Sequence, residues 1–504
     1  MKKSFLILPL LVLAMTGCDG NDDKSHAPAI ADPNSEEKSK EPEGGDIIKI
    51  MHLNDTHGAV EYLPESGEVG MSYLAGYVNS KRQAANTDVV LISSGDMFQG
   101  SIDSNVSQGK LMIDIMKEMR FDSMSIGNHD FDWGVDVLAE NFAYAMNKEH
   151  GGWALPFLSG NILNPQGEYA PGYLSTTFNR GGARISVIGS IDGGVYDSID
   201  AARVEGYEFV SATKMVVDEA ERLRKAGSDL IIYSTHDADK RVDASIASYV
   251  DAVFTGHNHH LSTATMVAPG TTKVVPVIES SCNGRAIGEV NFRYDEQTDS
   301  YQLLNYKNTS TSTIDPLVAD EAVQAIYDSY LDAPVQDGPI TADSLRSLKY
   351  DAVGEINESS IFASTDFIGQ SSVLSIFMLA QLDAYETTYD VDASAYNASR
   401  SSWPVGEITY SDIYKAFPFD NDTVVVEATG AQLSRWNTPI QFAEGLTKYN
   451  LVSTQVYRVV SSTYVLNNNE VGNFAGIVHT DTGVYQRHVM YQEFKKATTP
   501  NPWG

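Results

Sequence analysis

The 504-residue chain is too long for one ordinary hydrophobic core, so two or three domains are expected. Charged residues make up 20% of it and hydrophobic residues 42%, the proportions of a soluble globular protein. Acidic residues outnumber basic ones by 67 to 35, which gives a formal net charge of −32. This balance argues against long nucleic acids as partners, because their binding depends on Lys and Arg neutralising phosphates. A small phosphorylated substrate is compatible with it, because bound cations reverse the local field.

The first 18 residues have the pattern of an export signal. Lys2 and Lys3 precede the apolar run 5–15, which is too short to span a bilayer as a stable helix. The following stretch LAMTGC resembles a bacterial lipobox, although Met15 stands where leucine is usual. The resemblance implies lipidation of Cys18 and a location in the periplasm or cell envelope, with the membrane contacted only through the lipid. A plain signal peptide is the alternative.

Residues 19–46 contain no aromatic side chain and are rich in Asp, Glu, Lys, Ser and Pro. Such a segment buries too little apolar surface to offset the entropy of ordering, so a disordered acidic tether is expected. The chain has two cysteines, and if Cys18 carries lipid, Cys282 has no intrachain partner. Cys282 follows VVPVIESS, so we expect a buried strand thiol without a catalytic role.

From residue 47 to residue 315, short β-branched runs alternate with amphipathic stretches. This alternation is typical of an α/β domain built of stacked layers. The expected strands are Ile47–Leu53, Asp88–Ser93, Ile185–Gly189, Leu230–Ser234 and Ala252–Thr255, and the expected helices are Met71–Arg82, Lys110–Met119 and Lys214–Ala226. A connecting helix is predicted over Pro316–Ala333 within a linker, 316–344, and a second domain over 345–504.

Five segments of the first domain place Asp, Asn or His just after an expected strand. In open α/β sheets ligands bind beyond the carboxyl ends of the strands, so these segments can converge. Imidazole nitrogens with carboxylate and amide oxygens suit Zn²⁺, Mn²⁺, Fe²⁺ or Co²⁺. Seven donors are too many for one tetrahedral ion, whereas two ions sharing a carboxylate would use them all. The segments are Asp55–His57, Gly95–Asp96, Gly127–Asp132, Thr235–His236 and Gly256–His259.

The motif order D-x-H, GD, GNH(E/D), H and GHxH resembles the dinuclear metallophosphoesterases, and more narrowly the bacterial periplasmic 5′-nucleotidase and UDP-sugar hydrolase family. The resemblance implies a four-layer α/β/β/α sandwich followed by a smaller α+β domain joined by a helix. It also implies two divalent metal ions with a shared carboxylate, Asp96. One ion is expected to take Asp55, His57, Asp96 and His259, and the other Asp96, Asn128, His236 and His257.

His129 and Asp132 match the catalytic pair of that family. His129 would donate to charge developing on a phosphoryl or leaving-group oxygen, and Asp132 would orient the imidazole and favour its protonated form. Neighbouring polar residues are assigned structural roles instead. We expect Asp130 to be a scaffold hydrogen-bonder, His52 a satisfied strand histidine, and Asp237 a residue facing solvent.

The second domain contains VGEITYSDIYKAFPFDNDTVVVEATG over residues 405–430, which resembles the G-x-I-T-Y…PF-x-N…TG run of the 5′-nucleotidase C-terminal domain. The resemblance implies that Phe419 stacks on a nucleobase with Asn421 beside it. Tyr464 and Glu470 reproduce the spacing of the family's second aromatic and acidic residue. Stacking on aromatic rings contributes roughly 1–3 kcal/mol per base. Core packing is the alternative role for both rings.

The second domain also departs from the family pattern. The N-G-G-x-R turn is here Asn397–Arg400 without its glycines, although Arg400 keeps its spacing to Gly406. Residues 355–395 contain no Arg or Lys, whereas the compared 5′-nucleotidases have an arginine pair there that contacts phosphate. Nucleotide binding is therefore expected in a modified form.

Together these features predict an exported, monomeric dinuclear-metal phosphoesterase that hydrolyses nucleotides to nucleoside and phosphate through metal-activated water. The alternatives within the class are a 2′,3′-cyclic-nucleotide phosphodiesterase with 3′-nucleotidase activity and a UDP-sugar hydrolase. The alternative outside the class is a nucleoside-binding surface protein on a phosphatase scaffold, against which the presence of His129 and Asp132 argues.

Overall fold

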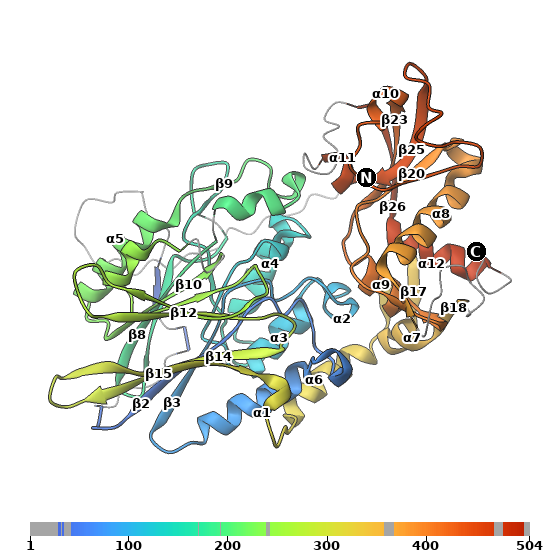
Figure 1. The fold of residues 1–504 in the computed structure, drawn as a ribbon. Coiled ribbons are helices and arrows are strands. Elements are labelled where there is room, and N and C mark those ends of the chain that lie inside the picture. Colours follow the sequence, from blue (N-terminus) through green and yellow to red (C-terminus); the bar gives the residue numbers. More distant parts are fainter. Residues whose placement is uncertain are drawn as a thin grey trace, which may run out of the picture.

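The computed structural model describes residues 29–31, 33–34, 42–169, 171–191, 193–237, 242–356, 367–467 and 477–497. The predicted signal, 1–18, and the predicted substrate contact Glu470 lie outside these ranges. Figure 1 shows a larger N-terminal lobe of two stacked sheets and a smaller C-terminal lobe, with helix α6 (Glu321–Leu331) running between them. None of the helices within the described ranges is both long and apolar enough to cross a membrane.

Two sheets packed face to face form the centre of the larger lobe (Figure 1). The first has the order β1-β7-β8-β10-β11-β13-β12 and the second β15-β14-β2-β3-β4-β5. In each sheet, four consecutive strands are parallel. Antiparallel strands extend both edges of the first sheet and one edge of the second. The parallel sets are β8 (Ala183–Ile191), β10 (Leu230–His236), β11 (Ala252–Thr255) and β13 (Val274–Ser280), and β2 (Ile47–Leu53), β3 (Thr87–Ser93), β4 (Ser123–Ser125) and β5 (Phe157–Leu158). The others are β1 (Ala29–Ala31), β7 (Ser175–Arg180), β12 (Leu261–Val267), β14 (Ala286–Asp295) and β15 (Ser300–Ser310).

Helices cover the outer face of each sheet, which gives the expected α/β/β/α layers. Helices α1 (Gly70–Arg82), α3 (Lys110–Glu118) and α4 (Val135–Met146) lie on the second sheet, and α5 (Ala212–Lys225) lies on the first. Between the sheets, side chains such as Ile50 and Phe254 are fully buried. Each such side chain contributes about 1.5–3 kcal/mol relative to exposure. The fold class predicted from the sequence is confirmed.

The predicted elements match the observed ones to within a few residues. Strands β8 and β10 run two residues further than expected, so His236 is the last residue of its strand. Helix α6 is shorter than the predicted Pro316–Ala333 because Asp320 caps it. The Asp320 carboxylate accepts hydrogen bonds at 3.0 Å from the backbone N–H groups of Ala322 and Val323.

Part of the segment expected to be a disordered tether is structured, which corrects that expectation. Residues Ala29–Ala31 pair in parallel with β7. The Asn34 side chain bonds both the carbonyl and the amide of Ala154, at 2.8 and 2.7 Å. Edge pairing uses main-chain hydrogen bonds, which do not depend on side-chain hydrophobicity. Composition therefore could not reveal this strand.

The smaller lobe has a five-stranded sheet of order β24-β20-β25-β23-β26. Helices α8 (Gln370–Tyr389) and α12 (Gln486–Lys496) pack together beside it, and α9 (Tyr410–Ala416) precedes β23. The Thr409 and Asp412 side chains form a capping box that fixes the start of α9. The strands are β20 (Ala393–Ala395), β23 (Asp422–Thr429), β24 (Ile440–Phe442), β25 (Val456–Ser462) and β26 (His479–Tyr485), and small two-stranded sheets pair β16 (Val335–Asp337) with β17 (Ile340–Ala342), and β18 (Ala352–Ile356) with β22 (Gly406–Thr409).

A buried lysine just after the linker fixes the chain to the larger lobe. Lys349, on helix α7 (Leu345–Tyr350), is 1% exposed. Its ammonium lies 2.8 Å from carboxylate oxygens of both Asp103 and Glu61 and 2.9 Å from the Tyr327 hydroxyl. These partners satisfy all three ammonium hydrogens, so the chain up to α7 is attached to the first lobe through α2 (Ile102–Asn105), which carries Asp103.

Candidate metal centre and its flank

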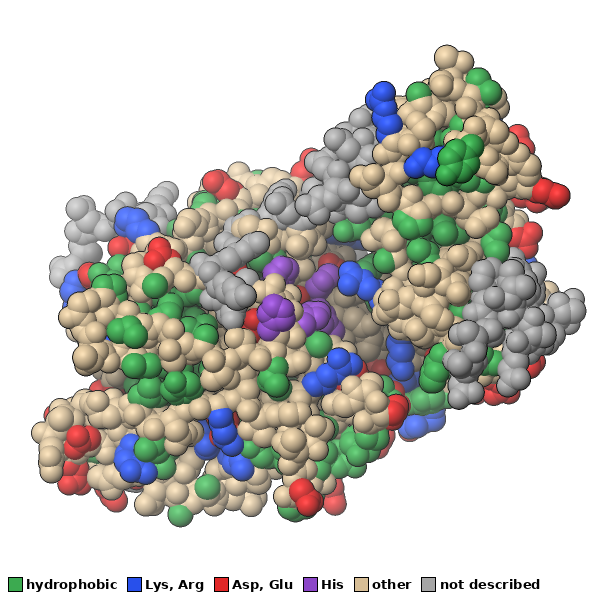
Figure 2. Space-filling model, viewed as in Figure 1, with side chains coloured by type: hydrophobic (Ala, Val, Ile, Leu, Met, Phe, Trp, Pro, Cys, Tyr) green, Lys and Arg blue, Asp and Glu red, His purple; other side chains and the backbone are tan. Residues whose placement is uncertain are grey.

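The seven predicted metal ligands meet at one edge of the two sheets, where parallel strands end. Asp55 and His57 follow β2, Asp96 follows β3, and Asn128 follows β4. In the other sheet His236 ends β10, and His257 and His259 follow β11. Figure 2 shows the histidines gathered in a hollow of the surface, with Lys and Arg side chains on its rim. Sheet topology thus brings together residues that are 202 positions apart, as His57 and His259 are.

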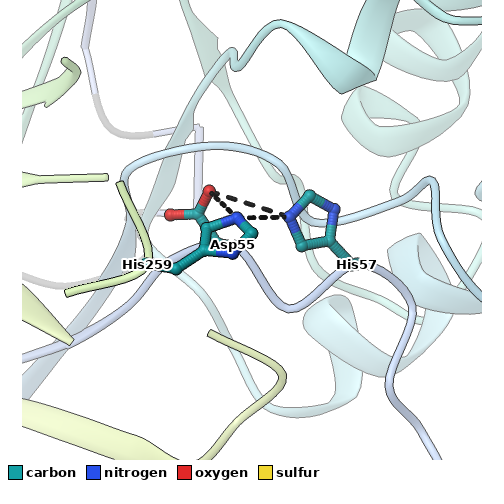
Figure 3. Close-up of side chains that lie close together, drawn as sticks. All are labelled: Asp55, His57 and His259. Carbon is teal, nitrogen blue, oxygen red and sulfur yellow. Dashed lines mark hydrogen bonds and ion pairs between the residues drawn. The ribbon is translucent and has the colours of Figure 1, made fainter. Parts of the chain in front are cut away.

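One group of donors consists of Asp55, His57 and His259 (Figure 3). The two imidazoles face each other with their Nε2 atoms 3.0 Å apart. The Asp55 Oδ1 atom lies 3.4 Å from Nε2 of His259 and 3.8 Å from Nε2 of His57. Two imidazole nitrogens and a carboxylate oxygen converging on one point are a donor set that suits a borderline divalent cation.

The second group surrounds His236. Its Nε2 atom lies 2.9 Å from the Asn128 amide oxygen and 3.2 Å from Oδ2 of Asp96. The same amide oxygen is 3.0 Å from Nδ1 of His257. Asp55 also belongs to this region, since donor atoms of Asp55, Asp96 and His236 lie within 4.8 Å of one another. Asp55 is thus the carboxylate common to both groups in this geometry, and a bridge through Asp96 stays a prediction.

Backbone carbonyls orient two of the histidine ligands. Nδ1 of His57 lies 2.9 Å from the Gln99 carbonyl, and Nδ1 of His236 lies 2.7 Å from the Ser94 carbonyl. Because a carbonyl can only accept, Nδ1 must carry the hydrogen in each ring. Nε2 is then the nitrogen that points into the centre and would bind a cation once it carries no proton. The donor set is therefore prepared for two cations without rearrangement of these rings.

The backbone is strained at five of the seven predicted ligands. Asp55, His57, Asp96, His257 and His259 have φ angles of 50°, 49°, 52°, 80° and 60°. Residues other than glycine rarely adopt this left-handed region, and each instance costs on the order of 1–3 kcal/mol. The surrounding fold must supply that energy, and such strain clusters at functional sites.

Two motif glycines allow the segments to approach each other. A Cβ at Gly127 would overlap the Asp96 carboxylate, and a Cβ at Gly95 would lie 2.6 Å from the Gly127 nitrogen. No side chain fits at either position. This explains why glycine directly precedes Asp96 and Asn128 in the sequence.

His129 lies beside the first group of donors and is paired with Asp132. Its Nδ1 atom is 3.0 Å from the Asp132 carboxylate, and its ring contacts His57 edge-on at 5.4 Å. Burial opposes the positive charge, but the carboxylates of Asp132 and Asp96 outweigh it and raise the pKa of His129 to about 9. The imidazole is therefore protonated at neutral pH and can donate from Nε2.

Two polar neighbours have the structural roles expected of them. Asp130 accepts hydrogen bonds from the backbone amides of Gly127 and Asp96, at 2.9 and 3.1 Å, and so ties two ligand segments together. Both nitrogens of His52 are satisfied, by hydroxyls at 2.9 and 2.8 Å.

Two other expectations were wrong. Asp237 is buried, not exposed, because β10 continues to His236 and the Asp237 carbonyl accepts from Gly256 of the next ligand segment. Cys282 is half-buried in a loop, since β13 ends at Ser280 and Ser281 adopts a φ of 60°. Its thiol interacts with the His259 side chain.

The predicted substrate contacts from the second lobe reach the same centre. Phe419 stacks on His129 with ring centroids 5.6 Å apart and an interplanar angle of 22°. The Arg400 guanidinium lies 5.0 Å from the centre of the Phe419 ring. Asn421 and Tyr464 join them in lining a cavity of about 320 Å³ that also includes Asp96, Asn128 and His257. Phe419 is thus half-exposed at the junction of the lobes, and the core-packing alternative does not apply to it.

Sequence reasoning missed Arg203 and Asp420, which line this cavity. Arg203 lies in a 3₁₀ segment (Ala201–Val204) of the first lobe and donates to the Asp420 carbonyl at 3.2 Å. No motif marks either residue, and only docking of the lobes shows their position. A second cavity, of about 440 Å³, also touches Phe419 and is bordered by Arg285, Lys415 and Cys282.

Two family models match the chain. The calcineurin-like phosphoesterase model matches residues 48–261, and the model of the 5′-nucleotidase C-terminal domain matches residues 352–438. The fold and the centre thus define a calcineurin-like metallophosphoesterase, which is a metal-dependent phosphoester hydrolase. With its second domain, the chain belongs to the 5′-nucleotidase family of these enzymes.

Relatives by sequence and structure extend across both lobes. Protein UshA of Yersinia enterocolitica is 24% identical over 441 residues, which cover 77% of this chain and 75% of that protein. Endonuclease YhcR of Bacillus subtilis is 24% identical over 420 residues, which cover 77% of this chain but 32% of that protein. Among solved structures, the 5′-nucleotidase precursor of Thermus thermophilus gives a TM-score of 0.67 at 18% identity, with 89% of this chain and 96% of that chain covered. At this identity the likeness shows the shared fold.

Proposed function

We propose that this chain hydrolyses nucleotides to nucleosides and phosphate with two divalent cations as cofactors. The observation that carries the proposal is the stacking of Phe419 on His129. It brings a flat aromatic surface of the second lobe next to the donor groups of the first. A phosphate bound at the centre would leave an attached nucleoside in the 320 Å³ cavity that Phe419, Asn421 and Tyr464 line.

The seven donors would hold the cations, and Zn²⁺, Mn²⁺, Co²⁺ and Fe²⁺ suit their nitrogen and oxygen atoms. When bound, two such cations would activate a water as nucleophile and stabilise charge on the phosphoryl oxygens. The donor geometry supports the binding of divalent cations and does not distinguish between these four metals. Metal binding is therefore part of the proposal.

His129 would serve as the proton donor to the departing oxygen. Its raised pKa of about 9 keeps the imidazole protonated, and Asp132 holds Nδ1 so that Nε2–H is directed away from the pair. General acid catalysis of this kind contributes typically 10²–10⁴-fold. Arg400 and Arg203 would supply positive charge in the cavity, in place of the arginines missing from residues 355–395.

The test is a panel of phosphoesters assayed with Mn²⁺, covering 5′-, 3′- and 2′,3′-cyclic nucleotides and UDP-glucose. We expect phosphate release from 5′-AMP that a chelator abolishes and added Mn²⁺ restores. Preference for a cyclic nucleotide or for UDP-glucose would replace the proposed substrate with that ester. Failure of metal-replete protein to hydrolyse any member would refute the proposal.

We also propose that the protein is exported and carries a lipid on Cys18. The support is the sequence alone, namely the basic start, the apolar run and LAMTGC. Mass spectrometry of the N-terminus after expression in a bacterium should find Cys18 as a diacylated first residue, and Cys18→Ala should abolish membrane association. A soluble product cleaved elsewhere would contradict this proposal.

A further inference from the structure

The loop Pro418–Asn421 carries Phe419 and joins α9 to β23; we call it the Phe419 loop. All four of its carbonyls accept hydrogen bonds from residues outside the loop. Three donors belong to the first lobe and two to the second. Gln99 and Asn105 bond the Pro418 carbonyl at 3.0 and 3.3 Å, Arg203 bonds Asp420 at 3.2 Å, Arg487 bonds Phe419 at 3.1 Å, and the Gln486 amide bonds Asn421 at 3.4 Å.

Among the donors of the second lobe, Arg487 makes the most extensive contacts. Its Nη1 donates to the Phe419 carbonyl at 3.1 Å, and its Nη2 forms an ion pair with the Asp420 carboxylate at 2.5 Å. It also forms a two-point pair with Asp337 of β16, with Nη2–Oδ1 and Nε–Oδ2 distances of 3.1 and 3.3 Å. One side chain thus connects the domain's interior to the loop that presents the aromatic ring.

The position of Arg487 leaves it little freedom to move. The residue is 1% exposed, and its guanidinium lies between the rings of Tyr414 and Tyr485, 4.3 and 5.1 Å from their centres. Arg487 lies in the first turn of α12, where the helix dipole disfavours a cation. The carboxylate and carbonyl partners of Arg487, rather than the dipole of its own helix, therefore stabilise its buried positive charge.

We propose that Arg487 is a positioning residue for nucleobase recognition: by holding the Phe419 carbonyl and the Asp420 carboxylate, it sets the place of the Phe419 ring relative to the metal centre. This inference rests on the proposed nucleotide hydrolysis. The three bonds from the first lobe are lost whenever the lobes separate, whereas the bonds from Arg487 lie within the second lobe. Arg487 therefore keeps the loop in shape independently of the contact between lobes.

The test is Arg487→Lys, which retains the charge but has a single ammonium in place of the planar fork. An ammonium cannot reach Asp337, Asp420 and the Phe419 carbonyl together, so the loop should lose its fixed position. We expect KM for 5′-AMP to rise about tenfold while kcat changes less than about twofold. For ribose 5-phosphate, which has the phosphate and sugar but no base, kcat/KM should stay within about twofold.

The matched control is Arg458→Lys, on β25 of the same lobe, whose 46% exposed guanidinium pairs with Asp390 and Glu427 away from the loop. It should leave both substrates unaffected. Equal losses for 5′-AMP and ribose 5-phosphate in Arg487→Lys would mean a general structural role and would overturn the inference, as would an unchanged KM for 5′-AMP.

A second variant and a second measurement cover the remaining outcomes. If Arg487→Lys does not fold, Asp420→Asn removes the loop's half of the ion pair and leaves the pair with Asp337 in place, so the same KM increase is expected. Adenosine affinity, measured by calorimetry, reports base binding without turnover. If the wild-type protein hydrolyses no nucleotide, the proposed function fails, but a weaker adenosine affinity in Arg487→Lys would still support the positioning role and an unchanged one would refute it.

Discussion

The metal centre and the Phe419 loop face each other across the lobes, but they are built differently. The predicted ligands of the centre sit at or just after strand ends, and neighbouring backbone groups orient them, as the Ser94 carbonyl does for His236. The Phe419 loop has no such support from its own sheet and is held by side chains from three distant segments. The position of a site at strand ends follows from the sheet topology. The position of a loop such as the Phe419 loop depends instead on how the lobes pack. Under the proposed function, chemistry would therefore depend on a region placed by sheet topology, and substrate choice on a loop placed by the packing of distant segments.

The strongest test of this division is His129→Ala. The variant removes the proposed proton donor but none of the seven predicted metal ligands, so kcat should fall by roughly 10²–10⁴-fold while bound metal stays near the wild-type content. Metal is measured by elemental analysis alongside the kinetics. Asp130→Asn is a useful companion, because it alters a residue of the same turn that bonds only backbone amides. Loss of metal in His129→Ala would show that this residue belongs to the ligand set.

The attachment of α7 to the larger lobe can be weakened at Lys349. Lys349→Met leaves the buried carboxylate of Asp103 and the partly exposed one of Glu61 without their cation, and breaking a buried pair typically costs about 3–5 kcal/mol. We expect a lower midpoint in denaturant unfolding. The exposed pair between Arg346, on the same helix, and Asp332, at the end of α6, provides the control, and Arg346→Met should change stability by less than about 1 kcal/mol. Equal effects from the two variants would contradict the assigned role of the buried pair.

Phe419→Ala separates recognition from chemistry. Loss of one stacking surface should weaken the transition-state binding of 5′-AMP by about 1–3 kcal/mol, seen mainly as a higher KM. Activity towards ribose 5-phosphate should change little, because that ester has no base to stack. A comparable fall in kcat for both esters would mean that the contact of Phe419 with His129 serves the chemistry itself.

The last prediction concerns the pH dependence of metal affinity. In the metal-free centre, the pKa of His236 is raised to about 10, since Asp96 outweighs the effect of burial, and the Asp55 hydrogen bond raises the pKa of His259 to about 10. Burial instead lowers the pKa of His57 to about 4. Cations must displace protons from the first two rings, so affinity should rise with pH by up to about tenfold per unit for each proton displaced. Calorimetric titration with Zn²⁺ over roughly pH 6.5–8.5 measures this slope, and a flat profile would contradict it.

The sequence predicted the larger lobe and its centre well because their signals are local. The observed strands fall within a few residues of the expected ones, and six of the seven predicted ligands lie in the turns where their motifs predicted them, whereas His236 ends β10. The errors arose where distant pairing matters. Composition suggested no structure for residues 29–31, yet they form β1 against β7, and the apolar run before Cys282 did not show that its strand ends at Ser280.

What the sequence alone determined is the chemistry of the first lobe: the residue types, their order, and the glycines that let Asp96 and Asn128 meet. These follow from strand ends and turns, whose geometry is set within a few residues. The tertiary structure alone decided that Asp55 is common to both donor groups and that Phe419 lies on His129. It also decided that Arg487 holds the Phe419 loop, because a buried guanidinium acquires its partners only when β16, the loop and α12 pack together.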